Sequence, residues 1–121
     1  MTLGQIKQVF LKHMGQYSNQ SDDPSVMAQY MPEALAYINE GYAIAMQRYS
    51  PNQYFMPLEN DEDEPIFQPS SYHQILADYA AGRCLSSEPG RSDLANYLLA
   101  QFQSGLLNVN TPRYHFVNRW R

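Results

Sequence analysis

Four stretches of this chain place apolar residues at the spacing of an α-helix. The most regular runs from residue 33 to residue 49, where apolar side chains recur every three or four positions and share one face. They are Leu35, Ile38, Tyr42, Ala45 and Tyr49, with Met31 and Met46 widening the stripe. Because a long helix with one apolar face needs partners, we expect it to be the central helix of a small bundle.

The first helix is expected to begin at Thr2, because Thr2 and Gln5 have the spacing of a capping box. Gly15 is a suitable stop for it. Its apolar stripe consists of Leu3, Ile6, Phe10 and Met14.

The third helix is expected to begin at Ser70 or Ser71, where Ser71 and Gln74 form a second capping box. The fourth covers about residues 92–107. The predicted buried faces are Tyr72, Ile75, Leu76, Tyr79, Ala80 and Cys84 in the third helix, and Leu94, Leu98, Phe102, Gly105 and Leu106 in the fourth.

Pro32 leaves two interpretations of the chain before the long helix, since proline inside a helix removes a hydrogen bond. Either residues 25–31 form a separate turn and the long helix begins near Pro32, or one helix kinks there. The apolar phase continues through Met27, Met31 and Leu35, which favours a kinked or closely abutting pair.

Residues 51–69 contain four prolines and the acidic run ENDEDE, which forbid regular helix. Two short extended pieces, 53–56 and 65–68, can pair as a small β-hairpin or reach over a neighbour. A loop of this length exceeds what the connection needs, and such loops are often functional or disordered.

The composition fits one small domain with a modest core, since 44% of its 121 residues are hydrophobic. No run is long enough to span a membrane, and residues 1–13 lack the features of a signal peptide. The lone Cys84 fits a reducing compartment. We therefore predict an all-α bundle of about four helices with a long irregular loop.

Charge is unevenly distributed in this chain of net charge −4. Residues 112–121 hold three of the eight basic residues and none of the twelve acidic ones, leaving five basic and twelve acidic groups in residues 1–111. We therefore divide the chain into a helical domain, 1–111, and an extended C-terminal docking tail, 112–121. The candidate partner-binding residues of the tail are Arg113, Tyr114, Phe116, Arg119, Trp120 and Arg121.

The tail admits two interpretations. Chain ends are commonly disordered, but disordered segments tend to lack aromatic residues. Because this segment combines arginine with large aromatic side chains, the types that dominate interface energetics, we favour a segment that becomes ordered on a partner.

No motif predicts catalysis or cofactor binding. The acidic residues Glu59, Asp61, Glu62, Asp63 and Glu64 lack the glycine and spacing of a calcium loop, so we expect a solvated, self-repelling loop without metal. His13, His73 and His115 lie in different elements and are expected to be surface or cap residues. His73 and Cys84 are eleven residues apart on one predicted helix, too far for a nucleophile and its base.

The order of these patterns resembles the head–tail connector (adaptor) proteins of tailed bacteriophages. The likeness covers roughly residues 25–107 and is carried by AYINEGYAIAMQRYSP, PSSYHQILADYAAGRCL and SDLANYLLAQFQSGLL. The positions that match are Asn39, Arg48, Pro51, Pro69, Tyr72, His73, Ala95, Tyr97, Phe102 and Leu106. The acidic loop and Pro32 depart from the family pattern.

The resemblance implies a virion protein, assembled in the host cytoplasm, that forms a homo-oligomeric ring, a dodecamer, below the portal protein. Such a ring extends the DNA channel without specific DNA binding and gives the tail or stopper protein a platform. It has no catalytic site, cofactor or membrane contact. The five acidic loop residues are then expected at a subunit boundary or in the channel, and the tail on the portal or a neighbouring subunit.

Two other classes of function stay open. One is a cytoplasmic helical adaptor or regulator that acts as a monomer or dimer. The other, a small DNA-binding protein, ranks last because residues 24–107 contain only Arg48, Arg83 and Arg91 as basic residues.

Overall fold

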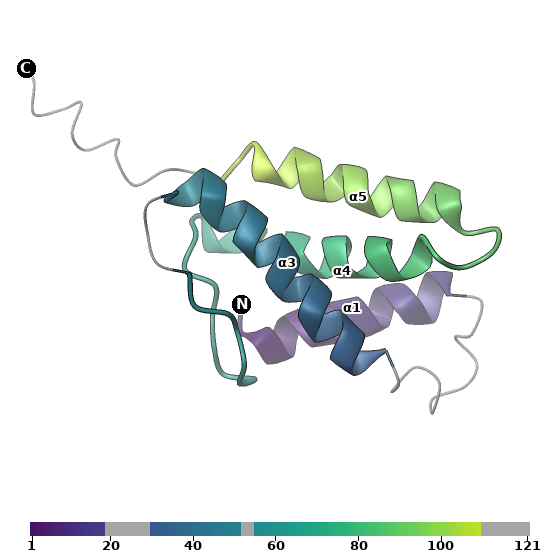
Figure 1. The fold of residues 1–121 in the computed structure, drawn as a ribbon, viewed down its shortest axis with the longest axis horizontal. Helices are drawn as coiled ribbons and strands as arrows, with labels where there is room; N and C mark the ends of the chain where they lie inside the picture. Colours follow the sequence, from purple (N-terminus) through teal and green to yellow (C-terminus); the bar gives the residue numbers. More distant parts are fainter. Residues whose placement is uncertain (19–29, 52–54, 110–121) are drawn as a thin grey trace, which may run out of the picture.

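The chain folds into a small helical bundle (Figure 1). A computed structural model describes residues 1–18, 30–51 and 55–109. Its helices are α1 (Leu3–Tyr17), α3 (Met31–Tyr49), α4 (Ile75–Leu85) and α5 (Ser92–Leu106), with a short 3-10 helix, η1 (Ser70–Tyr72), before α4. The described residues contain no strand, which confirms the all-α prediction. The hairpin is not confirmed, and residues 53 and 54 lie outside the described part.

The centre of the bundle is α4 and not the longer α3. α4 packs against α1, α3 and α5, whereas α3 contacts α4 and, at few points, α1. Nine of the eleven residues of α4 are buried, because its sequence is apolar or small on nearly every side. The expectation of a central helix over residues 33–49 is therefore not confirmed.

The predicted apolar face of α3 is largely correct. Ile38, Tyr42, Ala45 and Met46 are buried, whereas Leu35 and Tyr49 are only partly buried. In α4 and α5 the predicted faces are also buried, except for Leu94 and Tyr72, which pack at the edge of the core.

The helix ends agree only in part with the sequence signals. The capping box of Thr2 and Gln5 is present, but α1 continues through Gly15 to Tyr17. Gly15 therefore does not end the helix. It also lacks the positive φ of a glycine that ends a helix, which among the described residues only Gly90 has.

The second capping box is not formed. Ser71 lies within η1, and α4 begins at Ile75 without a side-chain cap. Pro32 lies in the first turn of α3, where its missing N–H costs no intrahelical hydrogen bond. This agrees with the interpretation that the long helix begins near Pro32; residues 25–29 lie outside the described part.

Glycines allow α5 to approach α4 closely. A Cβ on Gly82 would lie 2.8 Å from Leu99 Cγ, and a Cβ on Gly105 would overlap Ile75 Cγ2. At these two glycines the backbone of one helix lies directly against side chains of the other, and a larger side chain would disturb this packing.

Polar side chains join α3 to α4 at the edge of the core. The Tyr79 hydroxyl and Arg83 Nη1 both donate to Glu40 Oε1, and the Arg83 guanidinium lies 4.8 Å from the centre of the Tyr37 ring. Burial, followed by the hydrogen bond to Glu40, raises the pKa of Tyr79. Tyr79 therefore packs in the core while its hydroxyl keeps a partner.

A buried carboxylate holds together the ends of α1 and α3. Glu88, after α4, accepts hydrogen bonds at Oε2 from Ser18 Oγ at 2.9 Å and from the Tyr30 hydroxyl at 2.8 Å. Burial, and then Glu88, raises the pKa of Tyr30. None of the helices in the described ranges is long and apolar enough to cross a membrane.

Candidate interaction surface

The segment 55–69 lies against α3 at one end of the bundle (Figure 1). Two side chains of α3 hold it by its backbone. Asn39 Nδ2 donates to the Leu58 carbonyl at 2.9 Å, and the Leu58 amide donates to Asn39 Oδ1 at 2.7 Å. The Ile66 amide donates to the Tyr42 hydroxyl at 3.1 Å. These three bonds fix both arms of the segment to one helix.

The turn of the segment also covers the start of α1. The Leu3 amide donates to the Asp63 carbonyl at 2.7 Å, and the Gly4 amide donates to the Asp61 carbonyl at 2.9 Å. The first amides of a helix have no partner within it, so the segment acts as a cap that is distant in sequence. Lys7 Nζ adds an ion pair with Asp61 Oδ1 at 2.8 Å.

Asp63 shapes the turn from within. Its carboxylate oxygen Oδ2 accepts hydrogen bonds from the amides of Glu59 and Asn60 at 2.9 and 2.8 Å, and these bonds lower the pKa of Asp63. The expected self-repelling loop is therefore only half correct. The acidic side chains are largely exposed, but hydrogen bonds to α1 and within the turn fix the backbone that carries them.

His73 contacts the segment 55–69 through Phe67. It is buried, and its Nε2 lies 2.8 Å from the Phe67 carbonyl, while its Nδ1 lies 3.1 Å from the amino group of Met1. Its ring meets that of Phe67 edge-on at 4.8 Å. Burial lowers the pKa of His73. The expectation of a surface histidine is wrong for this residue, because the ring is a buried link to the segment.

The other histidines differ from it. His13 Nε2 lies 2.8 Å from Asp78 Oδ1, which joins α1 to α4. His115 lies outside the described residues.

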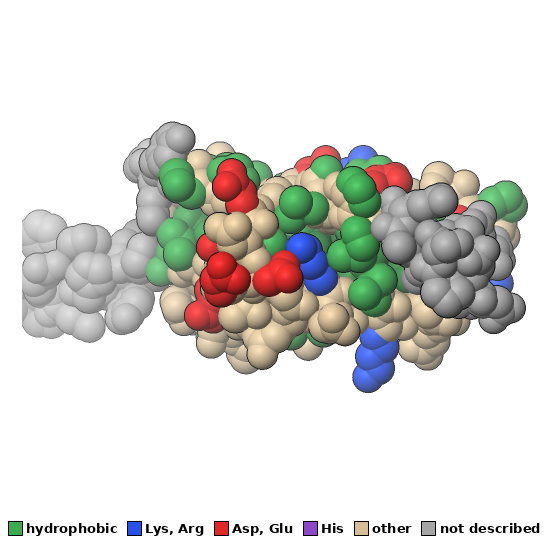
Figure 2. Space-filling view, turned by 90° about the horizontal axis from the view of Figure 1, so that it is seen from below, with side chains coloured by type: hydrophobic (Ala, Val, Ile, Leu, Met, Phe, Trp, Pro, Cys, Tyr) green, Lys and Arg blue, Asp and Glu red, His purple; other side chains and the backbone are tan. Residues whose placement is uncertain are grey.

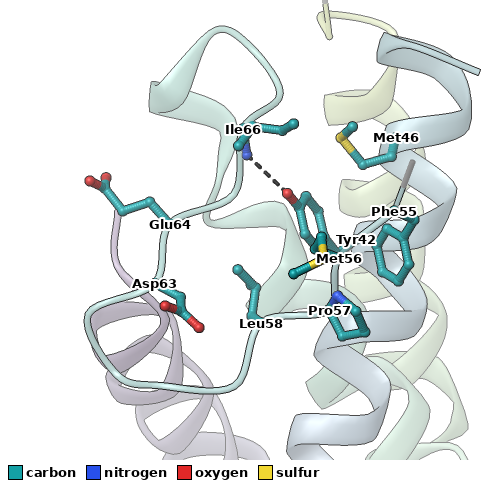
Figure 3. A pocket seen from close by; sticks show the side chains of 9 residues that line it. All are labelled: Tyr42, Met46, Phe55, Met56, Pro57, Leu58, Asp63, Glu64 and Ile66. Carbon is teal, nitrogen blue, oxygen red and sulfur yellow. Dashed lines mark hydrogen bonds between the residues drawn. The ribbon is translucent and has the colours of Figure 1, made fainter. Parts of the chain in front are cut away.

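A cavity of about 290 Å³ opens between α3 and the segment 55–69 (Figure 3). Tyr42 and Met46 of α3 form one wall, and the backbone and side chains of the segment form the other. The lining residues contributed by the segment are Phe55, Met56, Pro57, Leu58, Asp63, Glu64 and Ile66. The site is thus a hollow with both apolar and polar lining, with Asp63 and Glu64 on one side.

Two apolar residues of the lining are open to solvent. Met56 is 66% exposed and Ile66 is 43% exposed. Scattered exposed apolar residues are common on proteins, but these two flank one cavity. The structure therefore offers a small apolar contact site beside the acidic turn.

Several acidic side chains form a cluster toward one end of the face drawn in Figure 2, and others lie along its upper edge. Asp61 pairs with Lys7, and Glu64 lies 3.4 Å from the amino group of Met1. Within the described ranges, Glu59 and Glu62 form no ion pair and are exposed. The turn therefore keeps unneutralised negative charge facing solvent.

The groups that this surface offers are exposed carboxylates and apolar side chains. In the part of the chain that the structure describes, no three His, Cys, Asp or Glu side chains are placed to hold a metal ion. Cys84 is buried in α4, and its burial raises its pKa to about 12, so it stays a protonated thiol at neutral pH. The cavity volume of about 290 Å³ lies at the lower end of the range of ligand pockets, roughly 300–1,000 Å³.

The structure brings the five predicted loop residues together in one turn. Asp61 and Asp63 contact α1 or the turn itself, and Glu64 contacts the amino group of Met1. Glu59 and Glu62 are exposed to solvent. The six predicted tail residues, Arg113, Tyr114, Phe116, Arg119, Trp120 and Arg121, lie outside the described residues.

Sequence patterns missed the residues that hold the segment. Asn39 and Tyr42 lie three positions apart on α3, where periodicity predicts only a face. The available signal for this attachment was the polar Asn39 close to Tyr42 on the apolar helix, together with the proline-rich loop that follows. Comparison with protein-family models, with curated proteins and with solved structures found no match to this chain.

Proposed function

We propose that this protein is a structural virion component, a head-to-tail connector that forms a ring under the portal protein. It extends the DNA channel and gives the tail or stopper protein a platform. The observation that carries the proposal is the acidic, partly apolar surface of residues 55–69, held to α3 and α1 by hydrogen bonds. A surface fixed in this way keeps its shape for repeated contacts.

The resemblance to connector proteins supports the proposal through residues with identifiable roles. Asn39 holds Leu58, and His73 holds Phe67. Arg48, near the end of α3, donates to the Leu107 carbonyl at 3.1 Å beyond the end of α5. The matching positions therefore include those that attach the segment and align α5 with α3.

The charge distribution agrees with a DNA channel that does not bind DNA specifically. Twelve acidic residues, five of them between positions 59 and 64, repel phosphate. We place the protein in the virion, without enzymatic activity or cofactor, and assign the basic segment 112–121 to contacts with the portal or a neighbouring subunit.

The second candidate is a helical interaction protein that acts as a monomer or dimer. The cavity favours it as much as it favours the connector, because a single partner peptide can also fill a hollow of this kind. The two candidates differ in assembly state.

Native mass spectrometry and negative-stain microscopy of the full chain distinguish them. The connector proposal predicts closed rings with an open centre, at least when portal protein is added. A monomer or a compact dimer under all of these conditions would favour the interaction protein.

A further inference from the structure

We propose that the cavity between α3 and residues 55–69 binds segment 112–121 of a second copy of this chain. The inference rests on the proposed ring and names the contact that closes it. One of the two aromatic residues Phe116 and Trp120 enters the cavity, and the neighbouring arginines pair with the acidic turn.

The cavity has the size and lining for one large side chain. Its volume is about 290 Å³, and its walls include the ring of Phe55 and the thioethers of Met46 and Met56. Sulfur and aromatic surfaces adapt well to an aromatic ring. Phe55 already packs 5.2 Å from the ring of Tyr42, so an entering ring would extend an existing aromatic pair.

The floor of the cavity is fixed before binding. The Tyr42 hydroxyl accepts a hydrogen bond from the Ile66 amide. The Asn39 side chain bonds to both the amide and the carbonyl of Leu58. Leu58 is buried. A preformed site loses little conformational entropy on binding, which suits a contact repeated in every subunit.

Charge selects the occupant. Asp63 and Glu64 line the cavity, and the exposed carboxylates of Glu59 and Glu62 lie on the same turn. Segment 112–121 carries Arg113, Arg119 and Arg121 and no acidic residue. No other stretch of ten residues in the chain combines three arginines with a tryptophan, and tryptophan, tyrosine and arginine are the residue types enriched at interface hot spots.

The segment has the reach to contact a neighbour. Arg48 fixes the Leu107 carbonyl to the end of α3, and Val109 is buried. Trp120 is eleven positions after Val109, a span that extends to roughly 36 Å at 3.3 Å per residue. This exceeds the length of α3, about 28 Å for its 19 residues. The segment can therefore extend past its own bundle to the next one.

This pairing generates a ring because its two halves are different surfaces. Each copy offers one cavity and one basic segment, so every copy binds one neighbour and is bound by another. Such a head-to-tail interface forms a closed ring when the rotation between copies closes.

Two full-length variants test the contact. The cavity variant is Met56→Ser with Ile66→Ser, which alters exposed side chains and keeps the Ile66 amide that bonds to Tyr42. The segment variant is Phe116→Ala with Trp120→Ala. The matched control is Ile44→Ser, since Ile44 is 37% exposed on α3 and does not line the cavity.

Sedimentation of the wild-type chain should show rings, and the control should match it. Each variant alone should require on the order of 30-fold higher concentration to associate. An equimolar mixture should form dimers and nothing larger, because one cavity and one segment remain intact between the two variants. Circular dichroism and thermal melting of each variant check that the bundle is folded.

A second variant, Glu59→Lys with Glu62→Lys, keeps the test valid if the cavity variant unfolds. It should weaken association by roughly tenfold at low salt and by less at high salt. Rings that persist unchanged in the folded variants would overturn the inference and leave the proposed function standing. A mixture that stays monomeric would show that an intact cavity and an intact segment on different chains do not pair, which also overturns it. A wild-type chain that is monomeric at every concentration, both alone and with portal protein added, would overturn both.

Discussion

The contact between α4 and α5 and the contact between α3 and residues 55–69 depend on different interactions. Between α4 and α5, glycines at positions 82 and 105 let apolar side chains interlock, and shape complementarity determines the contact. Between α3 and residues 55–69, the contacts that fix the backbone come from Asn39 and Tyr42, which hydrogen-bond to a segment without regular structure. The first region makes the bundle stable, and the second presents a surface.

The difference indicates where function can be altered without unfolding the protein. A core contact affects the whole bundle when it is lost, because its neighbours have no alternative partners. A hydrogen bond between a side chain and a loop affects mainly the loop. Substitutions in the two regions should therefore differ in size and in extent.

The largest effect is expected for Ile38→Ala. Ile38 is fully buried on the inner face of α3, so its truncation removes apolar contacts and leaves a cavity, at a cost of about 2–5 kcal/mol in the free energy of unfolding. Urea denaturation followed by circular dichroism measures it. The same change at the partly exposed Leu35 should cost less, and equal costs would contradict the burial of this face.

Gly105→Ala should destabilise the protein by about 1–3 kcal/mol, because the new methyl group overlaps Ile75. Gly15→Ala is the matched control, since Gly15 lies in α1 with no atom within 4 Å of the added Cβ. It should stabilise the chain by about 0.5–1 kcal/mol through helix propensity. Opposite signs in thermal melting support the close approach of α4 and α5, and equal signs contradict it.

Asn39→Ala should cost about 1–3 kcal/mol, because the backbone amide and carbonyl of the buried Leu58 both lose their hydrogen bonds to Asn39. Asn96→Ala, at an exposed site on α5, is the control and should be nearly neutral. A loss of the same size in both variants would show that the clamp contributes no specific stability.

A smaller effect is expected from pH. Burial holds the pKa of His73 below its ordinary value of 6.5, so the unfolded chain binds this proton more readily than the folded one. Stability should therefore decrease as the pH falls below about 6.5. His73→Gln should flatten this part of the curve of melting temperature against pH, and an unchanged curve would assign the dependence to other groups.

The sequence predicted the helices because their signals are local. Apolar residues at helical spacing located α1, α3, α4 and α5, and the Thr2 capping box located the start of α1. Sequence spacing did not reveal that α4 is the centre of the bundle. The long, regular apolar stripe of α3 led to the expectation that α3 was the central helix. The apolar residues on all sides of α4 were the better signal.

The attachment of residues 55–69 could not be predicted in the same way. The Asp61 and Asp63 carbonyls accept from amides of Gly4 and Leu3, and those partners are about 60 residues away in sequence. Backbone carbonyls carry no residue-specific pattern, so no local motif marks such a cap. Asn39 was marked only by the family resemblance, which gave it no structural role.

Amide hydrogen exchange tests most directly whether side chains of α3 fix the interaction surface. In the wild-type chain, the amides of Leu58 and Ile66 should be protected although they lie in a loop, because they donate to Asn39 and Tyr42. The exposed Glu62 amide should exchange rapidly. In Asn39→Ala, Leu58 should lose its protection while Ala80 in α4 keeps its own. Exchange of Leu58 and Ile66 at the rate of an unstructured peptide in the wild-type chain would contradict the account.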